Sequence, residues 1–127
     1  MFPPLWWERL PYGRPSLPTT SRLDVGSDIV RKGTGGEDGY SGFTVRDPQG
    51  GEREGTELEP LLRGRGVRRL VILGLATDYC VKETALDAVA KGFDAMVLRE
   101  GVRAVDLSPG DGERALRDVE AAGGSVR

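Results

Sequence analysis

Residues 70–91 read LVILGLATDYCVKETALDAVAK, and this stretch decides the fold. It starts as an apolar run rich in β-branched residues, which is typical of a strand buried on both faces of a parallel sheet. Gly74 interrupts the run, and Thr77 or Asp78 can cap a helix that starts at once. Small and apolar residues then recur at helical spacing, at Val81, Thr84, Ala85, Ala88 and Val89. We therefore expect a buried strand, a tight turn and a helix that ends at Lys91-Gly92.

The only cysteine of the chain, Cys80, falls in the first turn of this helix, just past the end of the strand. Catalytic groups in open α/β sheets gather at this end of the strands. A helix N-terminus has unpaired N–H groups and a partial positive charge, which favour a nucleophilic thiolate and can hold an oxyanion. The alternative is a buried structural cysteine that behaves as a small hydrophobic residue. We favour the nucleophile.

Composition excludes several classes of protein. The 127 residues suffice for one domain, and a net charge of −2 with dispersed arginines predicts no nucleic-acid partner. The longest apolar run, residues 70–76, is far shorter than the ~18 residues of a membrane span, and an N-terminus cut by prolines predicts no signal peptide. A single cysteine fits a reducing cytoplasm. The absence of histidine excludes Cys–His and Ser–His pairs and His-ligated metal sites on this chain.

The N-terminal third predicts little regular structure. Residues 1–23 are expected to be irregular because prolines break every pattern, and Trp6, Trp7 and Tyr12 are expected to hold this segment down rather than to bind a partner. Residues 28–32 predict a short strand, which a glycine-rich loop over residues 33–42 follows.

The remaining segments alternate between helix and strand signals. Residues 47–55 predict a polar hairpin or turn, and Thr56 can cap a short helix with Leu58, Leu61 and Leu62 facing inward. Residues 93–98 predict a strand, residues 101–109 a loop, and residues 125–127 a short terminal strand. A last helix opens at Asp111 or Gly112, with Ala115, Leu116, Val119 and Ala122 facing inward. This alternation predicts an α/β fold with a parallel sheet flanked by helices.

A cysteine nucleophile needs a second group to assist it, and without histidine the candidates are carboxylates and lysines. The chain has three lysines, of which Lys82 and Lys91 lie on the helix after Cys80 and are expected to be solvated. Lys32 instead ends a predicted strand, at the same sheet edge as Cys80 if the strands are parallel. An ammonium group there can stabilise a thiolate. The alternative is an exposed lysine at a strand end.

Three segments resemble one family. Residues 74–88, GLATDYCVKETALDA, are similar to the nucleophile motif of the isochorismatase-like cysteine hydrolases, and most of all to that of nicotinamidases. RKGT at residues 31–34 with YSGF at 40–43 resembles the segment that carries the family's catalytic lysine. GVRAV at residues 101–105 with SPGD at 108–111 resembles the loop before its last helix. The resemblance covers about residues 28–127 and implies a Rossmann-like fold, with an irregular segment over 1–23 and a partial hydrolase domain over 24–127.

The resemblance implies a role for five residues. Cys80 would attack a carboxamide carbon to give a thioester with loss of ammonia, and Lys32 would stabilise the thiolate. The backbone N–H groups of Ala76 and Cys80 would form the oxyanion hole, beside a cis peptide bond between Leu75 and Ala76. Tyr40 and Tyr79 would line the substrate pocket, where aromatic faces suit a pyridine ring. The expected role of Asp78 is structural, as the cap of the helix.

The chain also departs from the family. The family begins with a strand that ends in a general-base aspartate, followed by a loop of Asp and His residues that binds a divalent metal. Nothing before Lys32 resembles these segments, and Asp24 and Asp28 are the only carboxylates close before it. We therefore expect the C-terminal part of such an enzyme, truncated at its N-terminus, with no metal or cofactor on this chain. The missing strands would leave the flank of residues 70–73 open, unless the Lys32 strand or another chain fills the gap.

Three interpretations follow. The favoured one is a cytoplasmic amidase of the nicotinamidase type that acts on nicotinamide or a similar small carboxamide, with activity impaired by the missing base. The second is a non-catalytic remnant or interaction module that pairs through its open edge, which also allows a homo-oligomer. The third is a vinyl-ether hydrolase of the isochorismatase type, and Cys80 argues against it because that chemistry does not need a thiol.

Overall fold

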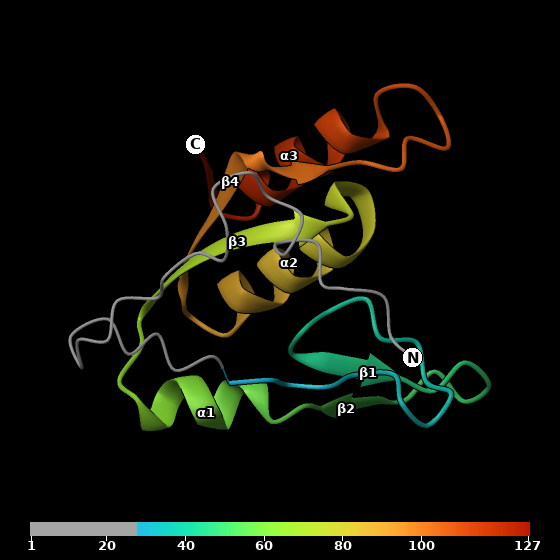
Figure 1. Ribbon diagram of the computed structural model, residues 1–127, viewed down its shortest axis with the longest axis vertical. Coiled ribbons are helices and arrows are strands. Elements are labelled where there is room, and N and C mark those ends of the chain that lie inside the picture. The colour runs from blue at the N-terminus through green and yellow to red at the C-terminus, as the bar shows by residue number, and fades with distance from the viewer. Residues whose placement is uncertain (1–27) are drawn as a thin grey trace, which may run out of the picture.

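The computed structural model describes residues 28–127 (Figure 1). The expectations for residues 1–23, including those for Trp6, Trp7 and Tyr12, lie outside the described residues. So does Asp24, one of the two carboxylates that precede Lys32.

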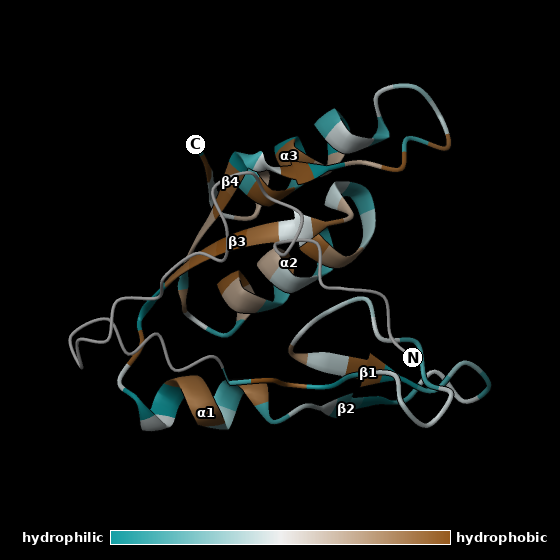
Figure 2. Cartoon of the chain, viewed as in Figure 1, coloured by the Kyte–Doolittle hydropathy of each residue, from teal (hydrophilic) through white to brown (hydrophobic). Residues whose placement is uncertain are grey.

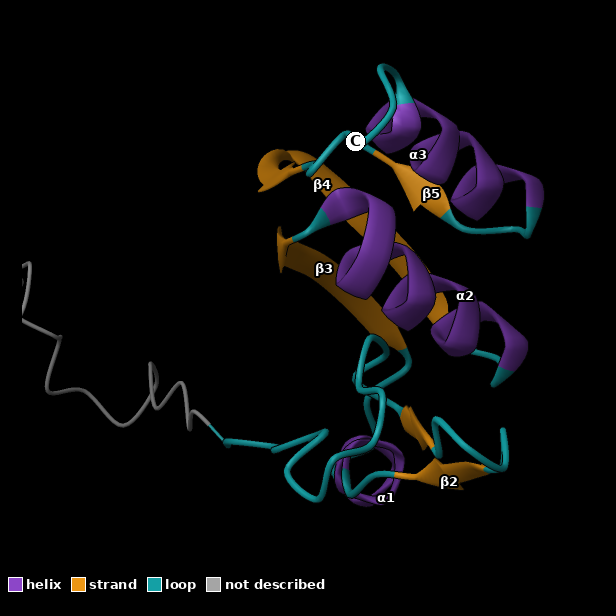
Figure 3. Cartoon of the chain, turned by 90° about the vertical axis from the view of Figure 1, so that its right-hand side faces the viewer, coloured by secondary structure: helices purple, strands orange, loops and turns teal. Residues whose placement is uncertain are grey.

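The main layer is a three-stranded parallel sheet in the order β3-β4-β5. Its strands are β3 (Arg69–Leu75), β4 (Asp94–Arg103) and β5 (Ser125–Val126). Helices α2 (Lys82–Ala90) and α3 (Asp111–Ala121) connect them and lie together against one face of the sheet (Figure 3). The predicted α/β fold with a parallel sheet is confirmed.

The connection from β3 to α2 is a short π-helical turn, Thr77–Val81, that runs directly into the helix. Val81, Ala85 and Ala88 are buried, so the predicted inward stripe of the helix is confirmed. The predicted cap is wrong. Ala76 precedes the turn without any side-chain cap, because Thr77 is buried and the Asp78 carboxylate has partners elsewhere.

The core lies between the sheet and its helices, where the apolar residues of β3 and β4 meet those of α2 (Figure 2). One cluster joins the sheet to both helices and consists of Val81, Ala85, Val97, Val102, Leu116 and Val119. A second cluster consists of Phe43, Ala88, Phe93 and Ala95. Full burial of a valine, leucine or phenylalanine side chain is worth about 1.5–3 kcal/mol, so these clusters hold the layers together.

A smaller unit lies beside the end of α2. Strands β1 (Thr44–Arg46) and β2 (Arg53–Gly55) form an antiparallel hairpin, which starts three residues before the hairpin or turn predicted over residues 47–55. The predicted short helix is α1 (Leu58–Gly64). Glu57 rather than Thr56 directly precedes this helix, and the Thr56 hydroxyl accepts a hydrogen bond from the Leu58 N–H at 3.2 Å. Leu58 and Leu62 pack against the second core cluster.

Three details differ from expectation. Residues 28–32 form no strand, since the Lys32 ammonium group instead closes the following loop by bonding its carbonyls. Residues 101–103 continue β4, because a shift in register lets Val102 and Arg103 pair with the end of β3. Ala122 is exposed rather than inward, since α3 ends one residue before it.

Strand β3 lies at the edge of the parallel sheet, and no strand within residues 28–127 pairs with its other side. Val71, Leu73 and Leu75 are 51%, 59% and 73% exposed. Alternate residues of a strand point to the same face, so these three side chains share the face opposite the helices. The expected open flank is confirmed within the described residues, whereas burial of this strand on both faces was a wrong prediction. Across residues 28–127, the helices are too short or too polar to cross a bilayer.

Candidate functional site

Cys80 lies in the π-helical turn at the C-terminal end of β3, where the sequence predicts it. The turn closes because the Val81 N–H donates to the Ala76 carbonyl at 3.0 Å and the Tyr79 N–H donates to the same oxygen at 3.2 Å. The Leu75–Ala76 peptide bond is cis, as the resemblance implies. Cys80 carries a free thiol and is neither buried nor fully exposed. Catalytic thiols typically occupy such partly exposed positions at the start of a helix.

Lys32 lies in the irregular segment that precedes the glycine-rich loop, and it is half-buried. Its ammonium group donates hydrogen bonds to the carbonyls of Gly39 and Tyr40, the latter at 2.6 Å. These bonds fold the loop back on the lysine. An ammonium group has three N–H donors, so one remains after both carbonyls are satisfied.

Tyr40 and Tyr79 bring these two segments together. Their ring centroids are 5.7 Å apart with the planes tilted by 35°, within the range of favourable aromatic pairs. Tyr40 ends the loop whose carbonyls accept hydrogen bonds from Lys32, and Tyr79 immediately precedes Cys80. Tyr40 therefore packs its segment against the turn that carries the thiol, and its side chain is half-exposed.

The core and the hairpin anchor the residues that follow Tyr40. Phe43 is almost fully buried, with its ring centroid 5.7 Å from that of Phe93. Thr56 donates its hydroxyl to the Gly42 carbonyl at 2.6 Å and its N–H to the Phe43 carbonyl at 2.8 Å. The loop that holds Lys32 is thus fixed at its far end.

Asp78 ties the turn to the loop between β4 and α3. Its two carboxylate oxygens accept hydrogen bonds from the N–H groups of Val105, at 3.0 Å, and Asp106, at 2.9 Å. Burial by itself raises the pKa of Asp78, but these bonds outweigh it and hold that pKa below the ordinary aspartate value. The sequence pattern does not identify these partners, because they lie far along the chain.

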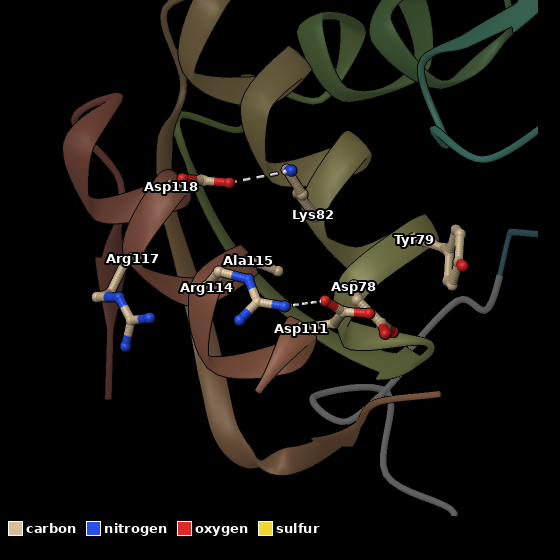
Figure 4. Close-up of a pocket in the computed structure, with 8 residues that line it drawn as sticks. All are labelled: Asp78, Tyr79, Lys82, Asp111, Arg114, Ala115, Arg117 and Asp118. Carbon is tan, nitrogen blue, oxygen red and sulfur yellow. Dashed lines mark hydrogen bonds and ion pairs between the residues drawn. The ribbon is translucent and has the colours of Figure 1, made fainter. Parts of the chain in front are cut away.

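A pocket of about 300 Å³ lies between the turn and α3 (Figure 4). It is lined by Asp78, Tyr79, Lys82, Asp111, Arg114, Ala115, Arg117 and Asp118. Most of its charges are paired with each other. Lys82 bonds Asp118 at 3.0 Å, and Arg114 bonds Asp111. Lys82 is therefore not a freely solvated lysine as predicted, and Lys91 likewise pairs with Glu59 at 2.7 Å.

Residues 28–127 offer no set of ligands that fits the family's divalent metal. The chain contains no histidine, and within residues 28–127 no three Cys, Asp or Glu side chains come together as a set of metal ligands. The Asp78 carboxylate, two residues from Cys80, already accepts hydrogen bonds from two backbone N–H groups. No step of the chemistry is therefore routed through a metal.

The chain is similar to amidases of several bacteria. It is 39% identical over 89 residues to a nicotinamidase of Escherichia coli, a match that covers 70% of this chain and 40% of that protein. It is 44% identical over 71 residues to a nicotinamidase/pyrazinamidase of Mycobacterium tuberculosis, covering 56% of this chain and 32% of the relative. The chain thus spans well under half the length of these relatives.

Solved structures agree with the fold. The pyrazinamidase of Pyrococcus horikoshii in complex with zinc superposes with a TM-score of 0.57 at 43% identity, covering 69% of this chain and 42% of that one. The nicotinamidase of Staphylococcus aureus gives a TM-score of 0.56 at 31% identity, covering 69% and 49%. The family model of the isochorismatase domain matches the sequence over residues 28–127, which are all of the described residues. This chain belongs to the isochorismatase domain family.

Proposed function

We propose that this chain carries the cysteine and lysine of a nicotinamidase-type amidase, which hydrolyses nicotinamide or a similar small carboxamide to the acid and ammonia. The observation that carries the proposal is the Tyr40–Tyr79 contact, which packs the Lys32 segment against the turn that presents Cys80. The nicotinamidases among its relatives support the substrate class. The lone cysteine fits a reducing cytoplasm as the place of this reaction.

The reaction runs in two halves. The Cys80 sulfur attacks the carboxamide carbon, and the negative oxygen that forms is held by the backbone N–H groups of Ala76 and Cys80. The C–N bond then breaks, and the thiol proton leaves with the nitrogen as ammonia. Water attacks the resulting thioester, the C–S bond breaks, and the acid departs as the thiol is restored.

Lys32 stabilises the thiolate and the charge that develops on the reacting groups. Its two bonds to loop carbonyls fix the ammonium group, and its third N–H serves the reacting centre. Tyr40 and Tyr79 offer aromatic faces to the ring of the substrate.

We further propose that these 127 residues by themselves hydrolyse the amide slowly. None of their carboxylates is assigned to take the thiol proton, and a general base contributes about 10²–10⁴-fold. The alternative of a non-catalytic module receives less support, because the relatives bear the names of amidases and amidohydrolases.

The test is ammonia release from nicotinamide by the purified chain, beside a Cys80→Ala control. Maleamate serves as a second amide, because a maleamate amidohydrolase of Pseudomonas putida is 37% identical over 71 residues. We expect the cysteine-bearing chain to release ammonia from one of these amides faster than the control. Equal rates for both proteins and both amides would contradict the proposed function.

A further inference from the structure

We propose that Asp87 is a positioning residue, whose carboxylate clips the segment that holds Lys32 onto α2, the helix that directly follows the turn of Cys80. The inference rests on the proposed function, since it assigns Asp87 a task in aligning the ammonium group with the thiol. Asp87 itself touches neither reacting group and acts through the loop.

The clip consists of hydrogen bonds between α2 and residues 41–44. One oxygen of Asp87 accepts the hydroxyl of Ser41 at 2.6 Å and the hydroxyl of Thr44 at 2.8 Å. One turn earlier on the helix, the Thr84 hydroxyl accepts the Gly42 N–H at 2.9 Å. Ser41 is only 5% exposed, so its hydroxyl depends on this carboxylate rather than on water.

The turn that carries Cys80 and the helix that carries Asp87 are continuous. Thr84 and Asp87 are three residues apart, about one turn of α2. The π-helical turn runs into α2 without a break, so the position of Cys80 is tied to that of the clip.

The other end of the clip reaches Lys32 in two steps. Ser41 follows Tyr40 directly in the chain, and the Tyr40 carbonyl accepts a hydrogen bond from the Lys32 ammonium group at 2.6 Å. The Tyr40 ring packs on Tyr79, next to Cys80. Loss of the clip would therefore let the loop move off α2 and carry the ammonium group with it.

The carboxylate suits this task chemically. An ionised carboxylate is an acceptor without donors, and it forms stronger hydrogen bonds with hydroxyl groups than a neutral acceptor does. Asparagine keeps a carbonyl oxygen that can accept from Ser41 and Thr44, whereas alanine leaves both hydroxyls without a partner. Asp87→Asn is thus the conservative variant, and Asp87→Ala is the disruptive one.

The experiment is a double-mutant cycle read out by alkylation of Cys80 with iodoacetamide at neutral pH. Cys80 is the only cysteine, so labelling reports on it alone. We expect Asp87→Ala to slow labelling about tenfold, in the middle of the range for coupled neighbours. In a Lys32→Met background the same change should slow labelling by less than about twofold, because the ammonium group that the clip positions is gone. Asp87→Asn should recover most of the rate.

The matched control is Glu59→Ala. This change also removes a carboxylate that anchors α2, but the partner is Lys91, directly after the helix, and the anchor is α1. A general loosening of the helix predicts similar effects of both changes, whereas the inference predicts that Glu59→Ala leaves the labelling rate unchanged. Slowing by Asp87→Ala to the same extent with and without Lys32, or no slowing at all, would overturn the inference.

Further variants distinguish failure of this inference from failure of folding or of the proposed function. If Asp87→Ala does not fold, Thr44→Val and Thr44→Ser replace it, since valine keeps the shape without the donor and serine keeps the donor. Valine should then slow labelling about threefold and serine should not. If Lys32→Met itself has no effect, the lysine role in the proposed function fails along with the inference. If only the Asp87 and Thr44 variants have no effect, the proposed function stands and the inference alone is wrong.

Discussion

Cys80 combines three features that favour a reactive thiol: it lies in a helical turn, it is partly exposed, and it follows the end of a parallel strand. The Lys32 ammonium group bonds the Tyr40 carbonyl, and the Tyr40 ring packs on that of Tyr79, the residue before Cys80. At the scale of single residues, the proposed chemistry rests on two side chains that different segments position.

The first prediction concerns the thiol. Iodoacetamide should label Cys80 faster than it labels a free thiol such as N-acetylcysteine at pH 7, because the proposed function requires a nucleophilic sulfur at this partly exposed position. Mass spectrometry of the intact chain over time measures the rate. Denatured protein is the control, and slower labelling of the folded chain would indicate an inert structural cysteine.

The second prediction concerns Lys32. Lys32→Met should lower kcat/KM for the amide substrate about 10²–10³-fold, the cost of losing one preorganised electrostatic contact at a reacting centre. Lys32→Arg should restore little, because a planar guanidinium cannot direct its donors to the Gly39 and Tyr40 carbonyls as an ammonium group does. Steady-state ammonia release measures both variants, and full activity of Lys32→Arg would argue against a defined ammonium position.

At the scale of elements, Asp78 and Asp106 connect the π-helical turn to the start of α3. Asp78 accepts the Asp106 N–H, and the Asp106 carboxylate in turn accepts the Gly112 N–H at 2.8 Å. The positive φ of 53° at Asp106 is one that aspartate tolerates better than most residues. Through this relay, the segment between β4 and α3 is anchored beside the thiol.

The third prediction follows from the lowered pKa of Asp78. A group whose pKa is lower in the folded than in the unfolded protein stabilises the fold above its unfolded pKa, and this contribution disappears as the pH falls through its folded pKa. Asp78→Asn should therefore be less stable than the original chain at pH 7, by about 1–3 kcal/mol for its lost charged hydrogen bonds.

Urea denaturation across the pH range measures this difference. It should remain constant from pH 7 to about pH 5 and shrink below pH 4, as the carboxylate of the original chain becomes protonated. A difference that stays constant down to pH 2 would show that the charge of Asp78 contributes nothing.

The fourth prediction concerns Gly112, which is buried where α3 starts. A Cβ atom there would lie 2.5 Å from the Cβ of Ala104, closer than folded proteins tolerate. Gly112→Ala should lower the free energy of unfolding by about 1–3 kcal/mol, since the loop backbone must shift to make room. Gly64→Ala is the control, because a Cβ at that position meets no atom within 4 Å.

At the scale of the whole molecule, the helices within residues 28–127 cover one face of the sheet and leave its other face open (Figure 3). The apolar side chains of Val71, Leu73 and Leu75 are exposed on the other face, at a strand edge that no strand within residues 28–127 completes. Exposed apolar patches and open edges promote association between protein chains.

The fifth prediction is that the purified chain self-associates and that Leu73→Lys weakens this association. The lysine charge disrupts the apolar patch. The free energy of unfolding should change by no more than about 0.5 kcal/mol, because Leu73 is already 59% exposed. Light scattering over a concentration series measures the effect. Leu107→Lys is the matched control, since Leu107 is the same residue type and even more exposed, at 76%, but lies outside the sheet. A chain that stays monomeric throughout would contradict the prediction.

Much of the fold follows from local sequence patterns. The strand–turn–helix order around Cys80, a hairpin or turn before α1 and three of the four inward residues of α3 were predicted correctly. Apolar residues that recur every two residues indicate one side of a strand, and every 3.6 residues one side of a helix. A few consecutive residues are enough to read either spacing. The position of Cys80 at the end of a strand required nothing more.

The sequence by itself thus determined the order of the elements from the hairpin onward, the place of the thiol and the family. The tertiary structure alone decided that Asp78 bonds Val105 and Asp106 rather than capping its own helix, and that Asp87 receives Ser41 and Thr44. It also decided that one face of β3 is exposed. The physical reason is that an apolar strand or a polar side chain is compatible with several surroundings. Its actual partners come from segments distant in the chain, which only packing brings into contact.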